Sequence, residues 1–150
     1  MLVPALNPDA AIIHVHQADE FGNARVFGTG IAHQECALAS KRVIISAEEI
    51  VSTDEIRRDP ARTSIPHFAV DAVVHAPFGA YPGTVQGYYA SDPEGVIEAM
   101  AAMFRGDFTD YLKKHVYSVA SHEEYLEKVV GQKKLALIRR RETIREGYGV

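Results

Sequence analysis

Apolar runs separated by polar turns divide the first half of the chain into short strands. Residues 10–16 and 43–46 have the length and apolar content typical of interior strands. Phe21, Gly22 and Asn23 follow the first run, and because Gly and Asn accept positive φ angles, they predict a tight turn leading into residues 25–27. A third run, residues 68–75, contains Asp71, which we expect at an edge, in a charge pair or facing a site.

Helical spacing alternates with these strands. Residues 30–39 carry apolar side chains at helical intervals, so residues 10–46 read strand, helix, strand, the pattern of a parallel pair with a right-handed crossover. Ser52 and Glu55 have capping-box spacing, and Ser91 and Glu94 flank Pro93 at another helix start. We interpret the apolar stripe of that second helix as core. It comprises Val96, Ile97, Met100, Met103 and Phe104.

The last third of the chain is predicted to be helical, over residues 107–115 and 123–146, with a break at Gly131. The side chains expected to dock here are Leu126, Val129, Val130, Leu135, Leu137 and Ile138. Together these patterns predict an α/β protein with an open, mostly parallel sheet flanked by helices in residues 1–105, and a helical extension in residues 106–150.

Composition narrows the class of protein. The chain has 150 residues, of which 47% are hydrophobic and 24% charged, as in an ordinary globular domain. Apolar runs are too short for a bilayer span, and the first residues lack a signal-peptide layout, so we expect a cytoplasmic protein without a membrane partner. A net charge of −4 argues against nucleic acid as a partner. The single Cys36 excludes an internal disulfide and a cysteine zinc cage made by this chain alone.

The first candidate functional residues are Glu48 and Glu49, which follow the apolar residues 43–45. Ligands of open α/β sheets bind beyond the carboxyl ends of strands, so the pair could face a pocket or an interface. The alternative is a solvated turn or the first turn of a helix, where carboxylates are favoured. His14 and His16 would share a strand face, but no third ligand lies nearby in sequence, so a hydrogen-bonded structural role is favoured over a metal site.

Two glycine-containing stretches are considered as further candidate sites. Gly28 and Gly30 lack the third spaced glycine of a dinucleotide fingerprint, so we predict no Rossmann cofactor site. Residues 76–89 are rich in Gly, Pro and Tyr, which is typical of a binding or subunit-contact loop, although an ordinary surface connection has the same composition.

A family resemblance is carried by two stretches, NPDAAIIHVHQADEFGNARVFG and ALASKRVIISAEEIVSTDEIRRDPARTSIPHFAVDAVVHAPFGAYPGTVQGYY. Their motifs ADEFGN, EEIV and APFGA, in this order and spacing, resemble the second half of the α (A) subunit of family I CoA-transferases of the glutaconate type. The resemblance covers residues 7 to about 103. It implies an open α/β fold, assembly with a B subunit, and transfer of CoA between an acyl-CoA and a carboxylic acid. CoA thioester would be a substrate, and no permanently bound cofactor is expected.

The resemblance also sets expectations for residues and partners. The family's nucleophilic glutamate lies on the B subunit, so no catalytic residue is expected in this chain. Candidates for a pocket wall or subunit interface are Glu48, Glu49, Asn23, Phe78, Gly79 and Tyr81. Nothing in these residues corresponds to the glycine-rich N-terminal half of the family's α (A) subunit, so the expected partners are that half together with a B-type subunit. Two alternatives stay open: a subunit of a ring-cleaving CoA-thioester hydrolase on the same fold, and a truncated, non-catalytic assembly module.

Overall fold

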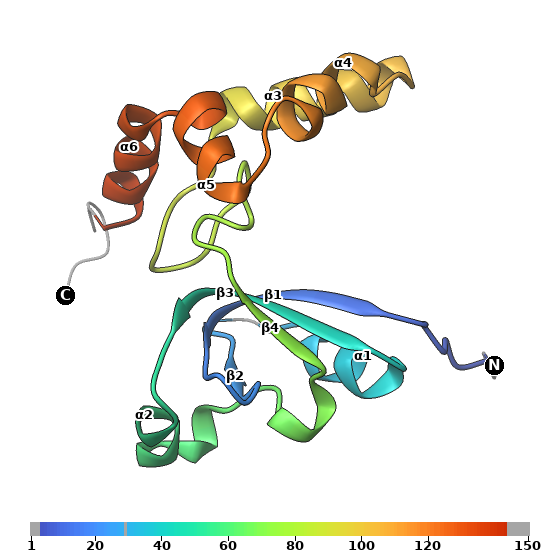
Figure 1. The fold of residues 1–150 in the computed structure, drawn as a ribbon, viewed down its shortest axis with the longest axis vertical. Helices are drawn as coiled ribbons and strands as arrows, with labels where there is room; N and C mark the ends of the chain where they lie inside the picture. Colours follow the sequence, from blue (N-terminus) through green and yellow to red (C-terminus); the bar gives the residue numbers. More distant parts are fainter. Residues whose placement is uncertain (1–3, 29, 144–150) are drawn as a thin grey trace. The chain divides into compact units, whose positions relative to one another are not determined.

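The computed structural model describes residues 4–28 and 30–143. It divides into two compact units, Met1–Gly79 and Ala80–Val150. In Figure 1 the first unit runs from blue to green and the second from green to red. The domain boundary predicted after residue 105 follows the extent of the family resemblance and stays a prediction.

The first unit is built on a four-stranded sheet of order β2-β1-β3-β4. Its strands are β1 (Ala11–Ala18), β2 (Ala24–Arg25), β3 (Val43–Ile50) and β4 (Ala72–His75). β1 and β4 both pair with β3 in parallel, and β2 returns antiparallel to β1 through a turn in which Gly22 has a φ of 101°. The predicted open, mostly parallel sheet and its hairpin are therefore confirmed. The hand of the crossover stays a prediction.

Helices of the first unit cover one side of this sheet (Figure 1). They are α1 (His33–Ala39) and α2 (Thr53–Arg58), with the short 3-10 turns η1 (Pro60–Arg62) and η2 (His67–Ala69). α1 begins later than the predicted residue 30 because Ala32, at its N-cap, is left-handed with a φ of 60°. The predicted cap of α2 is confirmed, since the Ser52 hydroxyl accepts a hydrogen bond from the Glu55 N–H at 3.2 Å.

The core of this unit lies between the sheet and α1. Alternate strand positions point into it, and they pack with Ala37 of α1 and Ile65. The buried strand residues are Ile13, Val15, Ala18, Ala24, Val43, Ile45 and Ala47. Each fully buried Ile or Val stabilises the fold by about 1.5–3 kcal/mol. The intervening positions, among them His14, Ser46 and Glu48, lie on the other face of the sheet.

Two strands differ from their predicted extents. β3 continues to Ile50 because its pairing with β1 runs on through Gln17↔Glu49. Glu48 and Glu49 therefore lie within the strand, and the interpretation of the pair as a turn or a helix start is wrong. β4 is shorter than predicted because residues His67–Ala69 form a 3-10 turn.

Asp71 is a paired charge, as expected, with the Arg42 guanidinium at 2.6 Å and the Val43 N–H at 2.8 Å.

The second unit is helical (Figure 1). It contains α3 (Pro93–Arg105), α4 (Thr109–Leu112) with the π-helical turn η3 (Lys113–Tyr117), α5 (His122–Glu124) with the π-helical turn η4 (Tyr125–Val130), and α6 (Gln132–Thr143). Gly131 separates the last two with a φ of 86°, which confirms the predicted break. Asp92, rather than Ser91, caps α3. The predicted helical residues 144–146 lie outside the described part of the chain.

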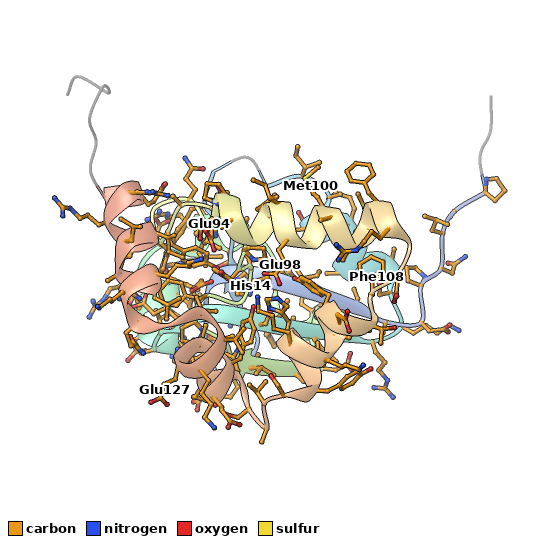
Figure 2. The ribbon with its side chains drawn as sticks, turned by 90° about the horizontal axis from the view of Figure 1, so that it is seen from above. His14, Glu94, Glu98, Met100, Phe108 and Glu127 are labelled. Carbon is orange, nitrogen blue, oxygen red and sulfur yellow. The ribbon has the colours of Figure 1, made fainter. Side chains whose placement is uncertain are left out.

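The apolar stripe of α3 is not core, which corrects the prediction from sequence. Ile97, Met100, Met103 and Phe104 are all exposed, with Phe104 78% exposed, and Val96 is only half-buried. α3 instead buries small residues, Gly95 and Ala102, and its Glu98 pairs with Lys114 of η3 at 2.7 Å. Figure 2 shows Met100 and Glu98 projecting from opposite sides of the helix. The packing side of α3 is therefore the polar, small-residue side.

Docking in the C-terminal helices is partly as predicted. Val130, Leu135 and Ile138 are buried, whereas Leu137 is exposed on the solvent side of α6, so its predicted docking is wrong. Leu126 and Val129 are not fully buried. Among the described residues, none of the helices combines the length and apolar character that crossing a membrane requires.

Candidate functional site

A hydrogen-bonded pair of side chains joins the two central strands of the sheet. Oε1 of Glu48, on β3, lies 2.6 Å from Nε2 of His14, on β1. The parallel register pairs His14 with Ser46, and Glu48 follows two residues later, so all three side chains lie on one face. Ser46 Oγ lies 2.9 Å from the other ring nitrogen of His14, Nδ1. The imidazole is thus held between a hydroxyl and a carboxylate.

The same carboxylate fixes a turn that follows β4. The Phe78 N–H donates to Glu48 Oε2 at 2.7 Å, and Phe78 is buried with a left-handed φ of 58°. Gly79 packs directly on the imidazole, since an added Cβ would lie 2.6 Å from Cε1 of His14 and 2.8 Å from the carbonyl oxygen of Ala76. A side chain does not fit at Gly79 without displacing the ring or the turn. We call His14, Ser46, Glu48, Phe78 and Gly79 the Glu48 clamp.

The clamp accounts for how a carboxylate can be buried at this position. Isolated buried carboxylates are costly, but each oxygen of Glu48 has a close donor: the imidazole on one side and a main-chain N–H on the other. Hydrogen bonds to a carboxylate are typically short, as these two are at 2.6 and 2.7 Å. With a donor on each oxygen, Glu48 is arranged to hold the turn at Phe78 in place.

Two other sequence-predicted site residues of the first unit lie apart from the clamp. Glu49 is exposed, and its Oε2 accepts from the Gln17 amide at 3.0 Å. Asn23 braces the β1–β2 hairpin: its amide donates to Asp19 at 2.8 Å, and its Oδ1 accepts from the His67 N–H at 3.1 Å. Burial alone would raise the pKa of Asp19, but the hydrogen bonds from Asn23 and its neighbours lower that pKa below the usual value. Asn23 therefore has a structural role in this unit.

Tyr81 belongs to the second unit. Its hydroxyl donates to Asp92 Oδ2 at 2.6 Å, and Lys134 Nζ lies 3.0 Å from the same oxygen. Burial first, and then the hydrogen bond to Asp92, raise the pKa of Tyr81 far above its ordinary value, so the phenol stays neutral. Of the six candidates, the structure brings together Glu48, Phe78 and Gly79.

Sequence reasoning missed the roles of His14 and Ser46 in the clamp. It paired His14 with His16, but the His16 ring accepts from the Phe27 N–H at 3.1 Å and packs against the Phe27 ring. Hydrogen-bonded roles for both histidines are confirmed, with separate partners. The signal was available in the two predicted parallel strands, because aligning residues 11–15 with 43–47 sets His14 beside Ser46. Within residues 4–28 and 30–143, no group of three His, Cys, Asp or Glu side chains is placed to hold a metal ion.

Comparison with models of protein families identifies the family to which this unit is similar. Residues 1–76, nearly all of the unit that contains the clamp, match the model of the family described as "Coenzyme A transferase". The chain belongs to the coenzyme A transferase family. The resemblance and the fold class predicted from sequence are thereby confirmed.

Individual relatives extend the match beyond the first unit. The chain is 47% identical over 146 residues to an uncharacterized protein of Archaeoglobus fulgidus, covering 97% of this chain and 33% of that protein. It is 40% identical over 128 residues to the A subunit of glutaconate CoA-transferase from Acidaminococcus fermentans, covering 85% of this chain and 40% of the relative. The crystal structure of glutaconate CoA-transferase from that organism superposes with a TM-score of 0.84 at 38% identity, over 91% of this chain and 43% of the other.

A shorter match concerns a different reaction. The IpdA subunit of the cholesterol ring-cleaving hydrolase of Rhodococcus jostii is 40% identical over 83 residues, which is 53% of this chain and 28% of that protein. The glutaconate CoA-transferase therefore matches more of the chain. In each of these comparisons the chain spans less than half of the relative's length.

Proposed function

We propose that this chain forms part of the A-type subunit of a CoA-transferase. It supports transfer of CoA between an acyl-CoA and a carboxylic acid, together with the remaining part of the A-type subunit, and with a B-type subunit. Family membership and the 40% identity to the A subunit of glutaconate CoA-transferase support this assignment. The CoA thioester is a substrate, and no permanently bound cofactor is invoked.

The observation that supports a division of labour between the subunits, with this chain positioning rather than attacking, is that both carboxylate oxygens of Glu48 accept hydrogen bonds. A transferase nucleophile must offer a carboxylate oxygen to the thioester carbonyl and displace CoA thiolate to form an anhydride. The thiolate then attacks the glutamyl carbonyl of that anhydride, which gives a glutamyl-CoA thioester and releases the acyl group as its carboxylate. Both Glu48 oxygens already accept close donors. We therefore assign Glu48 to positioning the turn at Phe78 and Gly79, which we propose forms a pocket wall or subunit interface. The family resemblance implies that the nucleophilic glutamate lies on the B-type subunit.

Reconstitution tests this assignment. The chain alone, and the chain assembled with a B-type subunit plus the rest of an A-type subunit, are assayed for CoA transfer from glutaconyl-CoA or glutaryl-CoA to acetate. We expect transfer only from the complete assembly. Inactivity of that assembly with dicarboxylic and 3-oxo acyl-CoA donors would contradict the proposal, and CoA release that needs no acceptor acid would assign the hydrolase reaction instead.

A matched variant separates positioning from covalent catalysis. Glu48→Gln keeps an acceptor for the Phe78 N–H but cannot form an anhydride. Because the proposed nucleophile lies on the B-type subunit, the assembled variant should retain measurable transfer. Glu49→Gln, on the neighbouring exposed position, is the control for assembly. Loss of all transfer by a folded, fully assembled Glu48→Gln enzyme would contradict this division of labour.

A further inference from the structure

Three side chains of the Glu48 clamp also form an array that suits nucleophilic chemistry. Ser46 Oγ lies 2.9 Å from Nδ1 of His14, and Oε1 of Glu48 lies 2.6 Å from Nε2 of the same ring. Because a carboxylate only accepts hydrogen bonds, Nε2 carries the ring proton, and Nδ1 of the neutral ring offers its lone pair to the Ser46 hydroxyl. The hydroxyl proton of Ser46 therefore faces a base, and a carboxylate orients that base.

A nucleophile, a base and an orienting acid recur together in hydrolases on unrelated folds. In the Ser-His-Asp enzymes the serine faces Nε2 of the histidine and the acid faces Nδ1, whereas here the two ring nitrogens are exchanged. The chemical requirement is the same in both arrangements, because one ring nitrogen accepts the hydroxyl proton while the other donates to the acid. Ser46, His14 and Glu48 meet this requirement within hydrogen-bonding distance.

The fold fixes this array in place. The parallel register sets His14 directly beside Ser46 on the adjacent strand. Gly79 packs on the ring, since an added Cβ would lie 2.6 Å from Cε1 of His14, and the Phe78 N–H holds the second oxygen of Glu48 at 2.7 Å. The base therefore keeps its orientation before any substrate binds, which lowers the cost of reaching a reactive geometry.

Apolar surface adjoins the Ser46 hydroxyl. Ser46 is half-buried on the sheet face opposite to the core, and 19% of the His14 side chain is exposed. On the side away from His14, the register pairs Ser46 with Val74 of β4, which is 50% exposed. Ile12, two residues before His14 and therefore on the same face, is 77% exposed. A hydrocarbon chain attached to Ser46 would cover these side chains, so the surroundings favour an acyl group over a charged one.

We propose that Ser46 is a nucleophilic serine that accepts acyl groups from thioesters and activated esters. Ser46 Oγ attacks the acyl carbonyl carbon while its proton passes to Nδ1 of His14. The bond from the acyl carbon to the leaving sulfur or oxygen then breaks, and the leaving group takes the proton from the imidazolium. The products are an acyl ester of Ser46 and a free thiol or alcohol. This reaction goes beyond the proposed CoA transfer, in which neither Ser46 nor His14 is a reacting group.

The test treats the full chain with p-nitrophenyl acetate and follows acetylation of each residue over time by mass spectrometry of its peptides. The chain carries Cys36→Ala, because the exposed thiol of Cys36 is a competing nucleophile. Ser40 is the internal control, since its hydroxyl donates to the main-chain carbonyl of residue 36 at 2.7 Å and not to a base. We expect acetylation of Ser46 to be at least about tenfold faster than that of Ser40.

Two variants separate activation of the hydroxyl from its exposure. His14→Gln removes the base and should slow acetylation of Ser46 at least about tenfold, whereas Ser40→Ala should leave that rate unchanged. Circular dichroism checks that each variant is folded. A further measurement needs no variant at the array: the nitrogen chemical shifts of His14 should show a protonated Nε2 and an unprotonated Nδ1.

Four results would overturn the proposal: no acetyl group on Ser46, equal rates at Ser46 and Ser40, an unchanged rate in folded His14→Gln, or a proton on Nδ1 of His14. None of them bears on the proposed function, which is measured as acceptor-dependent CoA transfer by the complete assembly. Conversely, acetylation of Ser46 in a lone chain whose complete assembly transfers no CoA would contradict the proposed function alone.

Discussion

Phe78 donates its main-chain N–H to Glu48 at 2.7 Å while holding a left-handed φ of 58°. Non-glycine residues in this conformation cost about 1–3 kcal/mol and persist where the surroundings determine them. Here the determinant is a carboxylate on the neighbouring strand, fixed in turn by His14 at 2.6 Å. The conformation of the turn after β4 therefore depends on a side chain 30 residues earlier.

Glu48→Ala should destabilise the first unit by about 1–3 kcal/mol, because it leaves the buried Phe78 N–H and the His14 ring without their acceptor. Glu48→Gln should fall between the alanine variant and the unmodified chain, since its amide oxygen still accepts from Phe78. Glu49→Ala is exposed and should change the free energy of unfolding by less than about 0.5 kcal/mol. Urea denaturation measures all three, and equal losses for Glu48→Ala and Glu49→Ala would contradict the clamp.

Gly79→Ala tests the close approach of the turn to His14. The added Cβ would lie 2.6 Å from the imidazole and 2.8 Å from the Ala76 carbonyl oxygen, and overpacking of this kind costs about 1–3 kcal/mol. Gly30→Ala is the control, because its nearest neighbour, Val26 Cγ1, would be at an ordinary contact distance of 3.5 Å. Thermal unfolding should show a lower midpoint for Gly79→Ala, and a midpoint equal to that of Gly30→Ala would show that the turn adjusts freely.

The ion-paired carboxylates of the second unit predict a loss of stability in acid. Hydrogen bonding to Lys114 is the main cause that lowers the pKa of Glu98, and Tyr81 and Lys134 lower that of Asp92 against the opposing effect of burial. A carboxyl whose pKa is lower in the folded state stabilises the fold above its unfolded pKa, and that stabilisation is lost as pH falls through the folded value. Unfolding of the second unit should therefore become easier below about pH 4.5, the ordinary value for Glu98.

Lys134→Met supplies the matched comparison for this pH dependence. It removes the partner at 3.0 Å from Asp92, so the difference in stability between about pH 7 and about pH 3.5 should shrink. Lys133→Met changes the exposed neighbouring position by the same substitution and should leave the pH dependence as it was. Denaturation curves at the two pH values, followed at the tyrosines of this unit, provide the measurement; identical curves for both variants would remove Asp92 from the explanation.

The fold followed from local patterns, but the clamp did not. Apolar runs and the Ser52 cap predicted the strands and α2, because those signals lie within a few residues of each other. The clamp joins positions 14, 48 and 78, and each pair meets only through strand register or a turn, which local spacing does not encode. The extent of β3 was underestimated for the same reason, since Glu48 looked unsuited to a strand until its buried partners were known.

The wrong prediction for α3 shows what helical periodicity leaves undetermined. The pattern correctly identified an apolar face of the helix, but that face is not the buried one. The buried residues, Gly95 and Ala102, are small and lie on the other side. Met100→Lys, at an exposed position (Figure 2), should therefore change stability by less than about 0.5 kcal/mol. Ala102→Leu, at a fully buried position, should cost about 1–3 kcal/mol. Urea denaturation distinguishes them, and the reverse order would restore the stripe as core of the second unit.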